Sequence, residues 1–435
     1  MRYIRTKAIS AAVLLFFSIS IFSGCSQNVL SSNKPLEVST SPSQQSDSNQ
    51  HQQTSPDVDS NASDNSNLSS DDKEQSEITS PPTQSSSNGS NSEPASPVKK
   101  EKKKVKALYL TGWTVGNDKN VQHYIDLAKR TEINAYVIDI KDDDGYVGYE
   151  SNIPAVREIG AWKKKYDADK VIKTFHDNGI HVIGRLVCFK DPVLSSKKPE
   201  FAIKKKDGSL WTAKQKTWLD PYKREAWPYI IEIAKEAVAK GFDEIQFDYI
   251  RFANDGDKKS MYFGEQELKK YEIINEFISY ARKELPDVIL SADVFGIICE
   301  NPGDREDIGQ HLEFIGRELD YISPMVYPSH YALGQAVNGK VFPKPDLEPY
   351  QVIYNSLVKA KNRISKVEGY QADVRPYLQG FTATWIGKGN YIEYTAKEVR
   401  DQIKAVYDAG YEEWIIWSAS NKYGKIEGAF LPEGE

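Results

Sequence analysis

Two aspartates, Asp248 and Asp293, lie near the ends of successive apolar runs of this chain. Side chains alternate between the two faces of a β-strand, so Gln246 would share a face with Asp248, and Ser291 with Asp293. If the two runs are neighbouring strands, about 4.8 Å apart, their carboxyl groups can approach within the ~5–5.5 Å of a retaining glycosidase or the ~6.5–9.5 Å of an inverting one. This spacing favours chemistry that uses two carboxyl groups together.

Two carboxyl groups at such a distance separate in pKa, because one ionised group disfavours ionisation of the other. One can then act as an acid and the other as a nucleophile or base, which is the chemistry of acetal hydrolysis. We assign Asp248 as the nucleophile or base and Asp293 as the acid. Arg251, close to Asp248 in the sequence, could hold a carboxylate ionised. The structural alternatives are a buried Asp248 bonded to Arg251 or to loop amides, and a cap by Asp293 on the loop at Gly296.

Other polar and aromatic residues also follow the ends of apolar runs. Asp139 and Lys141 would share one strand face, where Asp139 either contacts substrate hydroxyls or forms an ion pair with Lys141. Aromatic rings at such ends could stack on sugar rings, although packing under the loops explains each ring taken singly; these are Trp113, Tyr249, Tyr327, Trp385 and Trp417. The residues that we expect to line sugar subsites are Asp139, Lys141, Gln246, Arg251, Tyr327, His330, Gln379 and Trp417.

The sequence offers little support for a metal centre. The run 142–145, Asp-Asp-Asp-Gly, could supply oxygen ligands to calcium, but an Asp/Gly turn explains it better. The strand ends carry no cluster of histidines, which disfavours a metal-dependent hydrolase. We therefore expect no metal and no organic cofactor. Cys188 and Cys299 would follow strands that are not neighbours, so we expect free thiols there.

The elements that must position these residues follow from the alternation of apolar runs with amphipathic segments. Eight apolar runs occupy residues 105–113, 133–140, 180–189, 242–250, 287–295, 319–327, 373–381 and 411–419. Most are separated by amphipathic stretches of helical period, and the weakest helical pattern is in 296–320. Eight βα units favour a (β/α)8 TIM barrel, an α/β fold, over a doubly wound open sheet. In such a barrel the active site lies at the carboxyl ends of the strands.

The first quarter of the chain has a different composition. The protein has 8 Trp, 25 Tyr and 16 Phe, but none of them lies between Ser26 and Lys104. A segment without aromatic residues buries too little apolar surface to fold, so we expect a disordered linker over residues 25–104. Residues 1–24 have a basic start and an apolar stretch, which indicates an export signal. The folded domain would then occupy residues 105–435.

The signal ends in Phe-Ser-Gly-Cys, which resembles a bacterial lipobox with Cys25 as the acylated residue. An ordinary signal peptide and an uncleaved anchor are the alternatives, and all three place the domain outside the cytoplasm. We expect a lipid-anchored protein that faces the cell wall. The formal net charge of −6 gives the chain no reason to bind nucleic acid, and we expect it to act as a monomer.

Five stretches of the folded part resemble a known family: residues 107–113, 136–149, 244–252, 291–296 and 321–331. They are similar to a glycosyl hydrolase family that was long described as a domain of unknown function and that groups with α-amylase-like and polygalactosaminidase-like barrels. The resemblance implies a TIM barrel with a nucleophilic aspartate on strand four, which is Asp248 here. The strand-five acid of the amylase type is a glutamate, whereas this chain has Asp293 with Glu300 following, so either residue is a candidate for the acid.

Taken together, the residues and the resemblance predict an extracytoplasmic glycoside hydrolase that cleaves a polysaccharide of the cell wall or matrix. The alternative is a barrel that binds a glycan without cleaving it. The carboxyl pair argues against this alternative, because a binding site needs no acid that is kept protonated.

Overall fold

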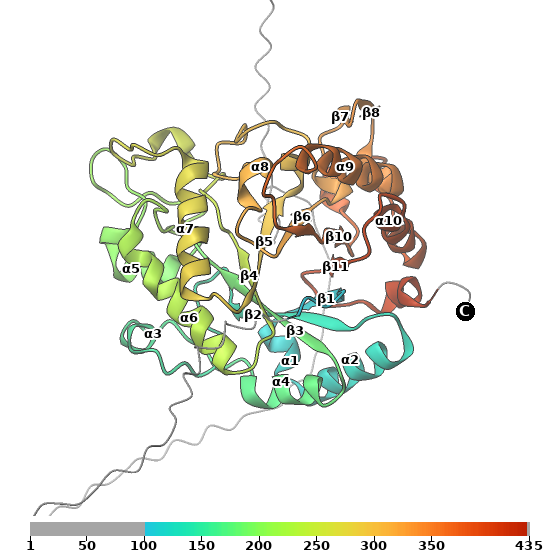
Figure 1. Cartoon of the computed structure of the whole chain (residues 1–435), viewed down its shortest axis with the longest axis horizontal. Coiled ribbons are helices and arrows are strands. Elements are labelled where there is room, and N and C mark those ends of the chain that lie inside the picture. The colour runs from blue at the N-terminus through green and yellow to red at the C-terminus, as the bar shows by residue number, and fades with distance from the viewer. Residues whose placement is uncertain (1–100, 433–435) are drawn as a thin grey trace, which may run out of the picture. The chain divides into compact units, whose positions relative to one another are not determined.

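Within residues 101–432, nine strands form one parallel sheet that closes into a barrel (Figure 1). The computed structural model describes residues 101–432; the predicted signal, Cys25 and the predicted linker up to residue 100 lie outside these residues. The strands are β1 (Lys106–Leu110), β2 (Ala135–Lys141), β3 (His181–Val187), β4 (Glu244–Asp248), β5 (Ile289–Phe295), β6 (Tyr321–Met325), β9 (Asp373–Val374), β10 (Tyr377–Gln379) and β11 (Trp414–Trp417). Each of them lies within or overlaps one of the eight predicted runs.

The barrel closes through its seventh strand, which has two parts. In the first part, β9 pairs with β6, and in the second, β10 pairs with both β11 and β6, where Tyr377 lies opposite Met325. Pro376 lies between the two parts and has no N–H to donate, although its carbonyl still accepts from Ile415. The remaining strands pair in chain order from β1 to β6, and β1 pairs with β11. The predicted (β/α)8 barrel is therefore confirmed, and the open-sheet alternative is wrong.

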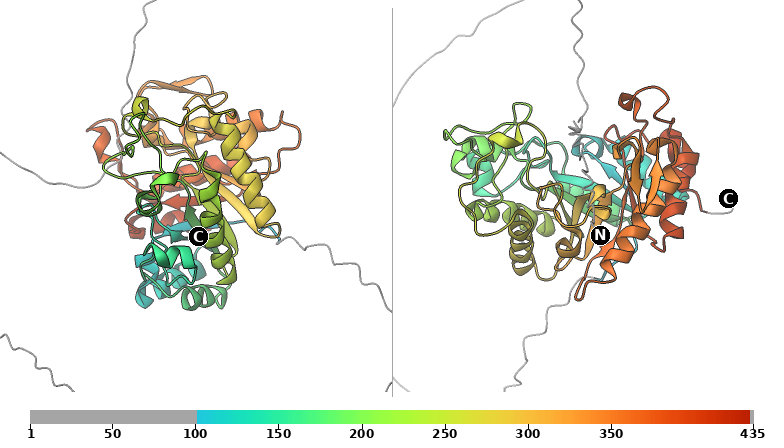
Figure 2. Two further views of the ribbon diagram at one scale, coloured as in Figure 1. Left: turned by 90° about the vertical axis from the view of Figure 1, so that its left-hand side faces the viewer. Right: turned by 90° about the horizontal axis from the view of Figure 1, so that it is seen from above.

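Helices surround this barrel (Figures 1 and 2). The longer ones are α2 (Asp118–Arg130), α4 (Ala168–His176), α6 (Trp227–Ala239), α7 (Lys270–Glu284), α9 (Pro349–Ile364) and α10 (Ala396–Asp408). The shorter ones are α1 (Gly112–Val115), α3 (Pro154–Glu158), α5 (Pro192–Lys197) and α8 (Leu312–Ile315). Only the short α8, preceded by the 3-10 helix η4 (Gly296–Cys299), occupies the connection whose helical pattern was weakest. A hairpin, β7 (Gln335–Val337) and β8 (Lys340–Phe342), is inserted after β6.

Local signals explain where the helices begin and end. At α10, the Thr395 side chain accepts from the backbone of the first turn and Glu398 accepts from the Thr395 amide, a reciprocal cap. The glycines that follow α4, α6 and α10 have φ values of +74° at Gly179, +105° at Gly241 and +81° at Gly410. A left-handed residue is favourable at the carboxyl end of a helix, and glycine adopts it without a steric penalty.

The inside of the barrel contains polar side chains that bond to one another. Near the amino ends of the strands, Arg375 forms a buried ion pair with Glu244 and lowers the pKa of this carboxyl to about 2, although burial alone would raise it. One layer further along, the Gln246 amide donates to Ser323 (3.3 Å) and accepts from Tyr377 (2.7 Å). Buried polar groups without partners would destabilise the fold. The barrel interior below the carboxyl ends of the strands is therefore filled by polar side chains that bond to one another.

The first described residues lie at the amino ends of the strands. Lys102 donates to the Asp320 carbonyl (2.9 Å) and forms an ion pair with Asp373 at the start of β9 (2.7 Å). Within residues 101–432, no helix is both long enough and apolar enough to cross a bilayer.

Candidate active site

Strand register brings the predicted acidic residues to one end of the barrel. Asp139 on β2 lies opposite Arg185 on β3, and Val187 on β3 lies opposite Asp248, the last residue of β4. On the next strand, Ala292 pairs with Phe247, so Asp293 follows beside Asp248. These positions are at the carboxyl ends of the strands, where active sites of this fold lie.

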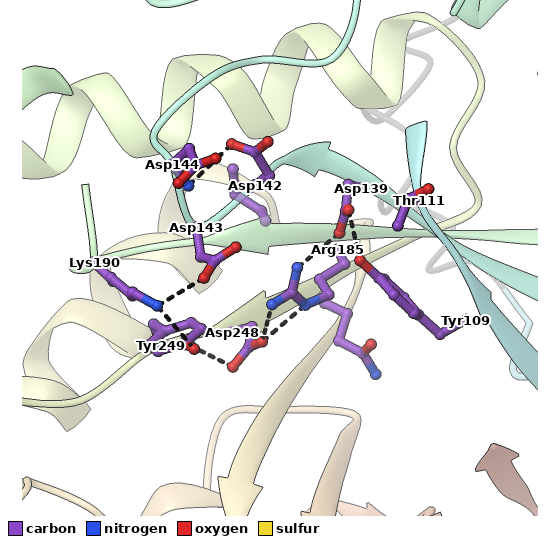
Figure 3. A network of polar contacts seen from close by, with 12 residues as sticks. Tyr109, Thr111, Asp139, Asp142, Asp143, Asp144, Arg185, Lys190, Asp248 and Tyr249 are labelled. Carbon is purple, nitrogen blue, oxygen red and sulfur yellow. Dashed lines mark hydrogen bonds and ion pairs between the residues drawn. The ribbon is translucent and has the colours of Figure 1, made fainter. Parts of the chain in front are cut away.

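Arg185 connects two of these carboxylates (Figure 3). Its Nη1 donates to Asp139 Oδ1 (2.7 Å), and its Nε and Nη2 contact Asp248 Oδ2 at 2.8 and 2.5 Å. Burial lowers the pKa of Arg185, but the carboxylates of Asp248 and Asp139 raise it well above its ordinary value. The Tyr109 hydroxyl donates to Asp139 Oδ2 (2.7 Å). All four side chains are buried, so each charge depends on these partners.

The second oxygen of Asp248 is held by the backbone. Asp248 Oδ1 accepts from the amide of Tyr249 at 2.6 Å. Tyr249 has φ +49°, a left-handed conformation that is strained for a bulky residue. Two bonds from the extension of β3 hold it there: the Cys188 amide to the Asp248 carbonyl (2.8 Å), and the Phe189 amide to the Tyr249 carbonyl (3.2 Å). The strain therefore lies directly beside a candidate catalytic group, as is common at functional sites.

Asp293 has a contrasting environment. It is 2% exposed, and its Oδ1 has no hydrogen-bond partner. Burial raises the pKa of Asp293 well above its ordinary value, and the charge of Asp248 raises it further. The two neighbouring carboxyls thus differ in the way that an acid and base pair requires, because Asp248 is bonded to a guanidinium and to a backbone amide, whereas Asp293 is buried with an unpartnered oxygen and a raised pKa.

The other candidate for the acid, Glu300, lies elsewhere. It follows η4, and its Oε2 accepts from the Asn338 amide of the β7–β8 hairpin (3.0 Å). Burial raises its pKa, whereas the nearby charges of Lys359 and Arg363 lower it. The geometry therefore favours Asp293 as the partner of Asp248.

Trp417 and Tyr109 form an aromatic wall beside Arg185. The two rings stack with centroids 3.9 Å apart, and the Arg185 guanidinium lies 5.3 Å from the Trp417 ring and 5.6 Å from the Tyr109 ring. Trp417 is half-buried, so part of its indole remains accessible.

Lys141 is not part of this site. A β-bulge between Asp139 and Lys141 changes the register with β3, so the predicted shared face is wrong. The Lys141 ammonium instead forms a wholly buried ion pair with Asp191 (2.5 Å) and lies 5.6 Å from the Tyr229 ring of α6. The alternative of an ion pair between Asp139 and Lys141 is also wrong, since Asp139 pairs with Arg185.

Three more predicted residues, Arg251, Gln246 and Gln379, are buried and bonded to protein groups. Arg251 donates to the Phe252 carbonyl and to Asn254 (both 2.9 Å), so the ion-pair partner of Asp248 is Arg185 rather than Arg251. Gln246 is buried in the barrel interior and bonded to Ser323 and Tyr377 as described above. Gln379 is also buried; its Oε1 accepts from the Ser329 amide and hydroxyl, and its Nε2 donates to Asp346 and to Phe381.

Tyr327 and His330 lie in the loop that follows β6. Their rings meet edge to face with centroids 5.2 Å apart, and the charges of Asp293 and Asp248 add to the burial that raises the pKa of Tyr327. The Ser329 hydroxyl contacts His330 Nδ1 (3.0 Å). Tyr327 is thus buried near the carboxyl pair, whereas part of His330 reaches the surface although burial of its imidazole lowers the pKa to about 4.

Sequence reasoning missed Arg185, Tyr109 and Lys190 as members of this network. Lys190 contacts Asp143 (2.7 Å) and the Tyr249 hydroxyl (3.2 Å), which links the loop after β2 to the strained residue (Figure 3). A signal for Arg185 was present, because a charged residue interrupts the apolar run 180–189. The run does not indicate which carboxylates the arginine meets.

The acidic run 142–145 forms the predicted turn. Asp142 Oδ1 accepts from the amides of Asp144 and Tyr146 (both 3.1 Å), and Asp142, Asp143 and Asp144 each pair with a lysine. Across residues 101–432, no three His, Cys, Asp or Glu side chains are arranged to hold a metal ion. Cys188 and Cys299 are buried free thiols, as predicted.

Comparison with known proteins gives a family and a fold. Residues 107–423 match a family described as "putative glycosyl hydrolase domain". No curated protein matches the chain.

Two solved structures illustrate the similarity. A hypothetical protein from Ruminiclostridium thermocellum is 73% identical, with a TM-score of 0.42, and the match covers 43% of this chain and 97% of that one. The PgaB (BpsB) glycoside hydrolase domain from Bordetella bronchiseptica is 15% identical, with a TM-score of 0.54, and the match covers 76% of this chain and 99% of that one. The second likeness shows a shared fold.

Proposed function

The chain belongs to this glycosyl hydrolase family, and on that premise we propose that it hydrolyses a polysaccharide outside the cytoplasm by means of Asp248 and Asp293. The family and the barrel make it a glycan-cleaving hydrolase. The observation that carries the two-carboxyl mechanism is the contrast between the two groups. Asp248 is held by Arg185 and by the Tyr249 amide, whereas the neighbouring Asp293 has an oxygen without a partner and a raised pKa.

In this proposal, Asp293 is neutral when substrate binds and donates its proton to the glycosidic oxygen as the bond breaks. Asp248, ionised, either attacks the anomeric carbon or removes a proton from the attacking water. Arg185 and the Tyr249 amide keep the Asp248 oxygens in place, and Asp139 with Tyr109 keeps Arg185 in place. This arrangement is preorganised, so it needs little rearrangement in the transition state.

The test is release of reducing ends from a panel of wall and matrix polysaccharides by the full-length protein and by its Asp248→Asn, Asp293→Asn and Glu300→Gln variants. We expect the two aspartate variants to lose release while they stay folded and retain glycan binding, and we expect Glu300→Gln to keep release. Full release by either aspartate variant would remove that residue from the mechanism. Loss in Glu300→Gln with activity kept in Asp293→Asn would move the acid to Glu300.

We further propose that Cys25 carries the lipid that anchors the protein outside the cytoplasm, facing the cell wall. The lipobox-like sequence supports this location. A Cys25→Ser variant should lose labelling by fatty acid and move from the membrane fraction to the medium. Unchanged labelling would overturn the proposal.

A further inference from the structure

A continuous run of aromatic rings leads from the carboxyl pair to the surface of the protein. Tyr327 meets Phe381 with ring centroids 5.7 Å apart, and Phe381 stacks with Trp385 at 5.7 Å with an angle of 25° between the planes. The His330 ring lies beside all three, at 5.2 Å from Tyr327, 6.4 Å from Phe381 and 6.5 Å from Trp385. We call Tyr327, His330, Phe381 and Trp385 the aromatic run.

The two ends of the aromatic run differ in exposure. Tyr327 is 5% exposed and lies close enough to Asp293 and Asp248 for their charges to affect its hydroxyl. Trp385, in the 3-10 helix η7 (Thr384–Ile386), is 53% exposed. An exposed indole is a large apolar surface in contact with water, and one that is continuous with a catalytic site marks a place where ligand surface could replace the water.

Hydrogen bonds hold the two loops of the aromatic run together. Gln379, the last residue of β10, accepts from the amide and hydroxyl of Ser329, at 3.1 and 2.8 Å, and donates to the Phe381 carbonyl at 3.0 Å. The Ser329 hydroxyl in turn contacts His330 Nδ1. The rings after β6 and those after β10 are therefore positioned by one buried amide, and ligand binding does not have to pay the entropy of ordering them.

We propose that Phe381 and Trp385, with the His330 imidazole beside them, bind a sugar ring of the polysaccharide chain at a distance from the bond that is cleaved. This inference rests on the proposed function and deepens it, because it makes the substrate a polymer that spans at least two binding positions. The sugar stacks its apolar face on the Trp385 indole, and a hydroxyl at the edge of the sugar bonds to His330. Short substrates that reach only the carboxyl pair do not contact Trp385.

The experiment measures binding separately from cleavage. Full-length protein carrying Asp248→Asn is run through native gels that contain each polysaccharide of the panel, with and without Trp385→Ala. The matched control is Tyr262→Ala, since Tyr262 is 47% exposed but lies outside the aromatic run. We expect Trp385→Ala to weaken binding of the polysaccharide that retards the parent about tenfold, with an unchanged Tm. Tyr262→Ala should leave this binding unchanged. Trp385→Phe should retain most of the binding that Trp385→Ala loses.

Kinetics provide the second readout. With Asp248 intact, Trp385→Ala should raise KM for the polymer and leave kcat/KM for a short oligosaccharide unchanged. The inference is overturned if every polysaccharide retards the parent and the Trp385→Ala protein equally. It is also overturned if no polysaccharide of the panel retards the parent. If Trp385→Ala weakens binding of a polysaccharide that the wild-type protein never cleaves, the proposed hydrolysis fails while the binding site stands.

Discussion

Replacement of Arg185 by methionine tests the central electrostatic claim of this structure. The guanidinium is 4% exposed and pairs with both Asp139 and Asp248. Methionine fills similar space but leaves two buried carboxylates without their cation. Removing one partner of a buried ion pair costs about 3–5 kcal/mol. In a protein of this size we expect a fall in Tm of roughly 5–15 °C at neutral pH.

The loss of stability in Arg185→Met should depend on pH, and the direction of this dependence follows from the pKa of the carboxyl groups that lose their cation. Burial already raises the pKa of Asp139 in the folded protein although Arg185 lowers it, so without Arg185 this pKa rises further above the ordinary value of about 3.9 in the unfolded chain. A raised pKa costs stability as pH rises from the unfolded value through the folded one. The Tm of the variant should therefore differ most from the Tm of the wild type at neutral pH, and this difference in Tm should become smaller as pH falls toward about 4.

The assay is thermal unfolding at several pH values between 4 and 8, with Arg224→Met as the control. Arg224 also makes a two-pronged pair, with Glu276 at 2.5 and 2.6 Å, but these side chains are 48% and 40% exposed. Such a surface pair contributes about 0–1 kcal/mol. A loss for Arg185→Met as small as that for Arg224→Met, or one that stays constant with pH, would refute the reasoning.

Three further predictions concern single positions. Folding raises the pKa of Asp293, so the wild type loses stability as pH rises through that value; the Tm of Asp293→Asn relative to wild type should therefore increase between pH 4 and 8, and a constant difference would contradict this. A Cβ at Gly296 would lie 2.4 Å from the Met325 carbonyl oxygen, whereas one at Gly424 meets nothing within 4 Å. In urea unfolding, Gly296→Ala should therefore cost about 1–3 kcal/mol and Gly424→Ala far less. The Lys141→Met variant should lose about 3–5 kcal/mol of its free energy of unfolding, because the buried Asp191 is left without its cation. Polysaccharide binding by the folded variant should be unchanged. Weaker binding in native gels would return Lys141 to the site.

The barrel could be predicted from the sequence because its signals are local. A buried parallel strand appears as a short apolar run whatever it pairs with, and each of the eight runs contains or overlaps a strand. The glycines after α4, α6 and α10 mark helix ends through their own backbone freedom. Asp248 and Asp293 could be selected in the same way, since a polar residue at the end of an apolar run is conspicuous before its neighbours are known.

The partners of these residues depended on the tertiary structure. Asp248 is three residues from Arg251 in the sequence, yet its cation is Arg185, 63 residues away, because strand register places β3 beside β4. Period-two alternation predicted a shared face for Asp139 and Lys141, and one bulge in β2 separated them. Apolar runs and the alternation of side chains along an extended strand are local properties. The sequence alone therefore determined which residues stand at the strand ends. Register, bulges and the fit of loops arise from the packing of distant segments, so only the folded barrel decided which carboxyl is held by a cation and which one is left without a partner.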